Sequence, residues 1–136
     1  MTVFVLDSSA VLRFIDKEAG AERVREIFRT CAGGHDEVRI SAVQWGEIAG
    51  NLRKRFGASA QKRILEGLTQ LAPGIVPASA DRAVRAAELR IDRKLAYADA
   101  FALDLAMDSP DHVLITAGYD FKAVADLARI EFLPVK

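Results

Sequence analysis

The sequence is poor in the residues and runs that mark secreted and membrane proteins. Among its 136 residues there is one cysteine, Cys31, which excludes an intramolecular disulfide framework and is compatible with a reducing cytosol. No apolar run approaches the ~18 residues of a membrane span. The first apolar run ends at Asp7 and has no basic segment before it, so no signal peptide is visible. We therefore expect a cytoplasmic protein with no membrane partner.

Net charge and linker-like stretches are also missing. The 19 basic residues balance the 19 acidic ones, which weakens any argument for nucleic-acid binding driven by total charge. That balance still leaves room for a local basic surface and an acidic pocket. No stretch rich in Gly, Pro or Ser divides the chain, and 51% of the residues are hydrophobic, which is enough for a buried core. We expect residues 1–136 to form a single domain.

Several catalytic motifs are absent as well. The two histidines, His35 and His112, have no metal-ligand spacing with another His or Cys, so no zinc site is implied. Ser8 and Ser9 lack the G-x-S-x-G elbow of a serine hydrolase. Neither G-x-x-x-x-G-K-[ST] nor G-x-G-x-x-G occurs, so nucleotide binding by those loops is unsupported.

What the chain does contain is an alternation of short apolar runs and amphipathic segments. Two runs, 3–6 and 112–116, are typical of buried strands, and shorter strands are expected at 38–41, 75–78 and 130–133. Apolar residues at helical spacing predict helices at 10–15, 21–31, 43–56, 58–71, about 80–94, 97–107 and 121–127. This order indicates an α/β fold, a three-layer α/β/α sandwich around a mainly parallel five-stranded sheet.

Asp7 is the first candidate for chemistry. It follows the strand 3–6 directly and precedes Ser8 and Ser9. In parallel α/β sheets, ligands bind at the carboxyl ends of strands. Asp and Ser are also favoured N-cap residues, so the alternative is that these residues only cap the next helix. The two roles are compatible if Ser8 or Ser9 caps the helix while Asp7 faces a pocket.

Two further acids occupy unusual helical positions. Glu47 lies off the apolar stripe of its helix, between Gly46 and Gly50, which suggests close backbone packing or room for a ligand; the alternative is a solvated Glu. Asp99 heads a stripe of small apolar residues, and a buried carboxylate needs a partner, which could be the helix N-terminus. Asp104 is expected to point away from that stripe into solvent.

The helix at about 80–94 carries four basic residues, Arg82, Arg85, Arg90 and Arg93. These side chains could face RNA. We favour the alternative that they form a solvated face balanced by neighbouring acids, because charged helix faces are common.

An α/β sheet can bring Asp7, Glu47 and Asp99 together at one edge, beside the loop after Thr116. Carboxylate oxygens are hard ligands that suit Mg²⁺ or Mn²⁺ far better than zinc. Such a cluster can activate water and neutralise a phosphate, which is the chemistry of metal-assisted phosphodiester hydrolysis.

Four segments, LDSSAVL, WGEI, YADAFALDLA and LIT followed by DFKAV, together resemble PIN-domain ribonucleases, most closely the VapC-like toxins of type II toxin–antitoxin pairs. The resemblance covers essentially the whole chain. It implies a PIN-like domain and a Mg²⁺- or Mn²⁺-dependent endoribonuclease. Asp7, Glu47 and Asp99 match the family's acids and would hold the metal, Glu47 directly or through water. Ser9 and Thr116 match its supporting hydroxyl residues.

One departure from the family pattern concerns the fourth acid. Gly118 stands where it is expected, and Asp120 follows two residues later. Either three carboxylates suffice, or Asp120 reaches into the site, or activity is weakened. The corresponding alternative function is a PIN-like module that binds RNA or a protein without turnover. An α/β receiver-type protein is disfavoured, because its paired early acids and its Lys at a strand end are missing.

The resemblance also implies partners. A small antitoxin would block the acidic groove, with a basic side chain such as Arg near the carboxylates. RNA would be the substrate, and self-association as a homodimer or higher oligomer is expected for this family.

Overall fold

A five-stranded sheet forms the centre of the protein, whose computed structural model describes residues 1–136. All neighbouring strands are parallel and lie in the order β3-β2-β1-β4-β5, which confirms the predicted sheet. The strands are β1 Val3–Leu6, β2 Glu37–Ser41, β3 Gly74–Val76, β4 His112–Thr116 and β5 Arg129–Phe132. β1 and β4 are in register from Val3 opposite His112 to Leu6 opposite Ile115, so their carboxyl ends coincide.

Six α-helices and one 3₁₀ segment connect the strands. They are α1 Ser8–Asp16, α2 Ala21–Ala32, α3 Ala42–Phe56, α4 Ala58–Gln70, α5 Ala80–Arg93, α6 Tyr97–Ala106 and η1 Tyr119–Val124. The hydroxyls of Ser41 and Ser79 cap α3 and α5 by accepting from backbone N–H groups. The last predicted helix, 121–127, is instead η1, which starts directly after Gly118. None of the helices combines the length and the apolar character that crossing a membrane requires.

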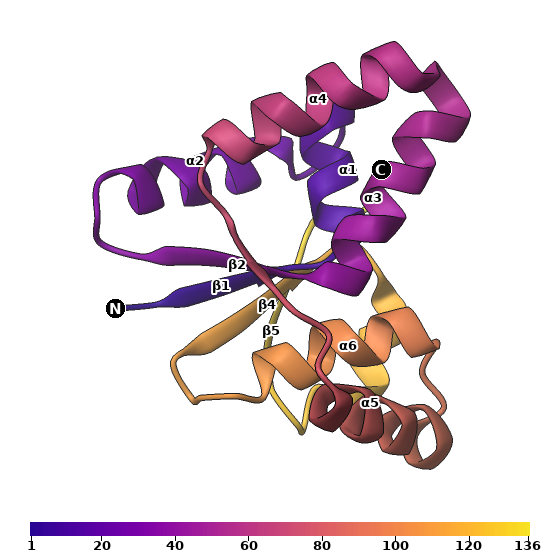
Figure 1. Ribbon diagram of the computed structural model, residues 1–136. Coiled ribbons are helices and arrows are strands. Elements are labelled where there is room, and N and C mark those ends of the chain that lie inside the picture. Colours follow the sequence, from indigo (N-terminus) through magenta and orange to yellow (C-terminus); the bar gives the residue numbers. More distant parts are fainter.

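One hydrophobic cluster lies on each face of the sheet. Helices α1 to α4 cover one face, and α5, α6 and η1 cover the other (Figure 1). Successive side chains of β1 point to opposite faces of the sheet, so Phe4 and Leu6 belong to the first cluster and Val5 to the second. Because both faces are covered, β1 and β4 are buried along their whole length. This arrangement confirms the three-layer sandwich.

The expectation that Asp104 is solvated was wrong. Asp104 is 3% exposed, because α6 is covered by the sheet on one side and by α5 on the other. Its carboxylate accepts hydrogen bonds from Arg82 at 2.9 Å and from Arg85 at 2.6 Å, and Arg82 also binds Asp108. A buried carboxylate requires such partners, so these two arginines stabilise α5 against α6 and are not a free basic face.

Candidate active site

Asp7 is fixed at the carboxyl end of β1, where α1 begins. The residue is 2% exposed and is itself the N-cap of α1, since its Oδ1 accepts from the Ala10 N–H at 3.0 Å. Ser8 and Ser9 are therefore inside the helix, and Asp7 combines capping with its place at the sheet edge. The strand forces this position, because it ends where the carboxylate can reach the orphan N–H groups of the first turn.

Two hydroxyls from different segments hold the Asp7 carboxylate. Ser9 donates to Oδ1 at 2.7 Å and Thr116, the last residue of β4, donates to Oδ2 at 2.6 Å. Ser9 Oγ in turn accepts from the Ala117 N–H at 2.9 Å. The network joins the ends of two adjacent strands. It occupies three of the carboxylate's roughly four acceptor sites, which leaves one on Oδ2.

The pKa of Asp7 reflects this environment. Burial raises the pKa above the ordinary value of an aspartate, and the negative charge of Glu47 adds to that effect. Hydrogen bonds from Thr116, Ser9 and Ala10 act in the opposite direction, because they stabilise the charged form. Asp7 is thus a buried acid whose ionisation the protein resists.

Glu47 approaches the site from α3. Its Oε1 accepts from Ser8 Oγ at 3.2 Å, next to Asp7 in the chain, and its side chain is exposed. No atom lies within 4 Å of a Cβ placed on Gly46 or Gly50. The suggestion of close backbone packing there was wrong, and the space beside Glu47 is open.

Asp99 lies in the first turn of α6 and is half-buried. Its pKa rises to about 6, through burial first and then through the negative charges of Asp7, Glu47 and Asp120, with no hydrogen bond to offset them. Asp7, Glu47 and Asp120 are therefore close enough to Asp99 to repel its negative charge. Asp120, on η1, takes part in this repulsion although Gly118 has no carboxylate.

Gln44 links the elements that carry the three principal acids, and the sequence reading missed it. Gln44 is fully buried in the first turn of α3. Its Oε1 accepts from the N–H of Ser8, the residue after Asp7, and its Nε2 donates to the carbonyl of Ala98, the residue before Asp99, at 2.7 Å. Glu47 follows it by one helical turn. The only available signal was a polar residue inside an otherwise apolar helix start.

The donor set fits a divalent cation of the Mg²⁺ type. All the acids offer carboxylate oxygens, the ligands that Mg²⁺ and Mn²⁺ prefer, and a cation between them would relieve the repulsion that raises the pKa of Asp99. As the side chains stand, no three His, Cys, Asp or Glu residues are grouped to hold a metal. The exposed Glu47 and half-buried Asp99 can turn, whereas Asp7 is held by its hydrogen bonds.

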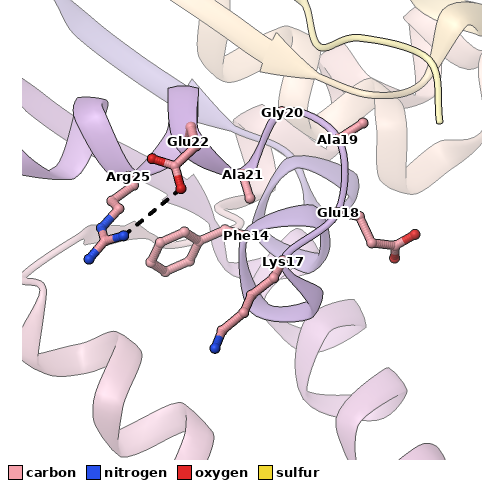
Figure 2. A pocket seen from close by; sticks show the side chains of 8 residues that line it. All are labelled: Phe14, Lys17, Glu18, Ala19, Gly20, Ala21, Glu22 and Arg25. Atoms are coloured by element: carbon pink, nitrogen blue, oxygen red, sulfur yellow. Dashed lines mark ion pairs between the residues drawn. The ribbon is translucent and has the colours of Figure 1, made fainter.

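The four acids differ in exposure: Glu47 and Asp120 are exposed, Asp99 is half-buried and Asp7 is almost fully covered. A hollow of about 420 Å³ between α1 and α3 begins at Ser9 and continues past Arg13 and Arg55. Another, of about 660 Å³, lies where α1 passes into α2, around the Phe14 ring and the Glu22–Arg25 ion pair (Figure 2). Neither hollow is lined by any of the four acids.

The sequence matches a protein-family model described as PIN domain over residues 4–127. No curated protein matches the sequence.

Solved structures share the fold over nearly the whole chain. DNA-bound VapBC from Salmonella typhimurium has a TM-score of 0.74 at 19% identity, covering 97% of this chain and 98% of that one. VapC20 from Mycobacterium tuberculosis, a sarcin-ricin-loop-cleaving toxin, has 0.68 at 18%, covering 98% and 100%. A toxin–antitoxin complex from Klebsiella pneumoniae has 0.62 at 24%, covering 89% and 90%.

Proposed function

Because the chain belongs to the PIN-domain family, with VapC toxins among its structural neighbours, we propose that it is a Mg²⁺- or Mn²⁺-dependent endoribonuclease and the toxin of a toxin–antitoxin pair. The single observation that supports this most is the gathering of acids around Asp99: Asp7 ends β1, Glu47 is hydrogen-bonded to the adjacent Ser8, and the charges of Asp7, Glu47 and Asp120 all raise the pKa of Asp99. Natural proteins retain such costly like-charge clusters where a cation or a proton transfer uses them.

Each residue has a distinct part in the proposed mechanism. Asp7 would hold the cation through Oδ2, with Ser9 and Thr116 fixing its orientation. Asp99 and Glu47 would complete the carboxylate set, Glu47 directly or through water, and Asp120 would add negative charge from the facing loop. A bound Mg²⁺ supplies a lowered pKa for water and neutralises charge that develops on the phosphate. The exposed side chains of Glu47 and Asp120 would be accessible to the RNA backbone.

We further propose partners on the same basis. Several structural neighbours are toxin–antitoxin complexes, including those from Klebsiella pneumoniae and Salmonella typhimurium. A small antitoxin would cover the acids and place a basic side chain, such as Arg, among them, because their repulsion makes a cationic group favourable there. The toxin would act on RNA in the cytoplasm and associate as a homodimer or higher oligomer.

Cleavage of total cellular RNA tests the enzymatic claim. With Mg²⁺ the chain is expected to create new, discrete 5′ ends. EDTA should stop this cleavage, and added Mn²⁺ should restore it. Asp7→Asn should lower the rate more than about 1,000-fold, as the loss of a central catalytic group does. Asp81→Asn, on the exposed first turn of α5, is the control and should cleave normally. Equal cleavage in EDTA would contradict the proposal.

The second candidate is a binding module without turnover, favoured by Gly118 at the position of the fourth acid. A Cβ there would lie 3.3 Å from Thr116 Oγ1, the hydroxyl that donates to Asp7. Induction in a bacterial host separates the two functions. Growth arrest that Asp7→Asn relieves supports the nuclease, whereas no arrest and no metal binding support the module.

A further inference from the structure

Tyr119, the first residue of η1, presents an aromatic ring that is partly exposed and rigidly held. The residue is 36% exposed. Its Oη donates to the Leu133 carbonyl at 2.8 Å, and its ring stacks on Phe132 with the centroids 5.5 Å apart and the planes inclined by 10°. A tyrosine on the surface normally loses rotamer entropy when a ligand orders it. Here the protein has already fixed the ring, so binding another flat group requires no further ordering of the tyrosine.

The ring lies beside the acids. Phe132, on which it stacks, is the register partner of Thr116, and Thr116 donates to the Asp7 carboxylate. The next residue along the chain is Asp120, whose charge raises the pKa of Asp99. Tyr119 follows Thr116 by three positions in the chain, which spans roughly 11 Å at most. A strand of RNA crossing the carboxylates would therefore pass the tyrosine with a neighbouring nucleotide.

Lys122 adds a positive charge to the same feature. Its Nζ lies over the Tyr119 ring, 4.8 Å from the ring centroid, which is a cation–π contact. The Lys122 side chain is exposed and forms no salt bridge. By contrast, Arg82, Arg85 and Arg93 are bound to acids. A base that stacks on Tyr119 takes the place of this ammonium, and the exposed lysine can then turn to the phosphate of the same nucleotide.

We propose that Tyr119 is a stacking platform for an unpaired RNA base beside the cleavage site, with Lys122 contacting the phosphate of the same strand. Proteins that bind single strands commonly combine a fixed aromatic ring with a nearby cation, because every base has a π-face and every nucleotide a phosphate. The inference rests on the proposed function, since it assigns RNA to this surface. It adds a specificity element: the strand must be unpaired at that nucleotide.

Binding without cleavage tests the platform. A fluorescein-labelled oligoadenylate is titrated in EDTA with chains that all carry Asp7→Asn, and anisotropy gives Kd. Tyr119→Phe keeps the ring and should bind within about twofold of the parent. Tyr119→Leu keeps apolar bulk but not the flat face and should weaken binding about tenfold or more. Phe56→Leu is the matched control: Phe56 is also exposed, but it lies at the far end of α3 and should leave Kd unchanged.

Two more measurements separate stacking from other causes. With an oligonucleotide of abasic ribose units, the difference between the Tyr119→Leu variant and the parent should disappear. Lys122→Gln should reduce the slope of log Kd against log salt by about 0.7, the value for one phosphate contact on a single strand. Lys62→Gln, on α4 across the sheet, should not change the slope.

The proposal is overturned if Tyr119→Leu binds oligoadenylate as tightly as Tyr119→Phe does. It is also overturned if Tyr119→Leu weakens binding of the abasic strand as much as it weakens binding of oligoadenylate. It is also overturned if Tyr119→Phe loses as much as Tyr119→Leu, because the hydroxyl contact with Leu133 would then be what matters. Thermal melts check that each variant is folded. The salt dependence of Kd for Lys122→Gln does not involve the hydrogen bond between the Tyr119 hydroxyl and Leu133. Since these titrations need neither metal nor turnover, they can fail while the cleavage test succeeds, and the reverse.

Discussion

Asp99→Asn is expected to abolish RNA cleavage and to raise the melting temperature of the metal-free protein at neutral pH. The amide cannot carry the charge that a cation needs, so cleavage should fall more than about 100-fold. The same change removes a carboxylate that the fold keeps among three others. Allowing for the partial solvent exposure of Asp99, the gain is about 1 kcal/mol, or roughly 3–4 °C for a chain of this size.

The raised pKa of Asp99 also predicts how the stability of the protein changes with pH. Folding raises the pKa of Asp99 to about 6, so the folded protein binds the proton more tightly than the unfolded chain does. The stability from this group is complete below about pH 4 and is lost as the pH rises through about 6. Melts in EDTA should therefore show the parent losing stability between these values, whereas the Asp99→Asn variant should have a flatter profile.

Asp92→Asn is the control for this comparison, because Asp92 is exposed on α5. It should change neither the melting temperature nor cleavage. Mg²⁺ at neutral pH should raise the melting temperature of the parent and not that of the Asp99→Asn variant. If Asp99→Asn lowers the melting temperature in EDTA, the carboxylate is a structural group with a favourable partner, and the repulsion argued for it is absent.

Gln44→Leu is expected to destabilise the protein by about 2–4 kcal/mol and to slow cleavage at least about tenfold. The leucine fills a similar volume but leaves the Ser8 N–H without its acceptor and removes the hydrogen bond to the Ala98 carbonyl. Each unsatisfied buried group costs about 1–3 kcal/mol. The cleavage defect follows because these hydrogen bonds hold the segments of Asp7 and Asp99 relative to α3, and a small misplacement of catalytic groups is costly.

A second glutamine bridge provides the matched control. Gln61, on α4, donates from Nε2 to the Ala49 carbonyl of α3 at 2.9 Å, so this bridge joins α4 to α3 and does not reach the segments of Asp7 and Asp99. Gln61→Leu should cost less than about 1 kcal/mol and leave kcat unchanged, because this bridge is only partly buried. Urea unfolding and single-turnover cleavage measure both quantities. Equal cleavage defects in the two variants would show that Gln44 acts through general stability alone.

The sheet was predictable because its two central strands, which are buried on both faces, consist almost entirely of apolar residues. Val3 to Leu6 and His112 to Thr116 are uninterrupted or nearly uninterrupted apolar runs, as strands covered on both faces require. The end of each run marked the sheet edge, so the positions of Asp7 and Thr116 followed from the same pattern. Their side-chain contact depends on the register of β1 with β4, which no local pattern specifies.

Features that depend on which helices meet were not predictable. The spacing around Asp104 favoured solvent on that side of α6, but α5 covers it and supplies Arg82 and Arg85. Likewise, Gln44 is an ordinary polar residue until α1 and α6 are both packed against α3. The effect of Asp120 on the pKa of Asp99 was not predictable either, because it depends on how the segment after β4 packs beside α6.

Calorimetric titration with Mn²⁺ tests most directly whether Asp7, Glu47 and Asp99 form one metal site. The parent chain is expected to show a saturable site near pH 7.5 that Mg²⁺ competes for. Asp7→Asn and Asp99→Asn should each eliminate it, Asp120→Ala should weaken it, and Asp81→Asn should leave it intact. Mn²⁺ binding that survives Asp7→Asn and Asp99→Asn unchanged would contradict the account, because the cation would then lie elsewhere on the protein.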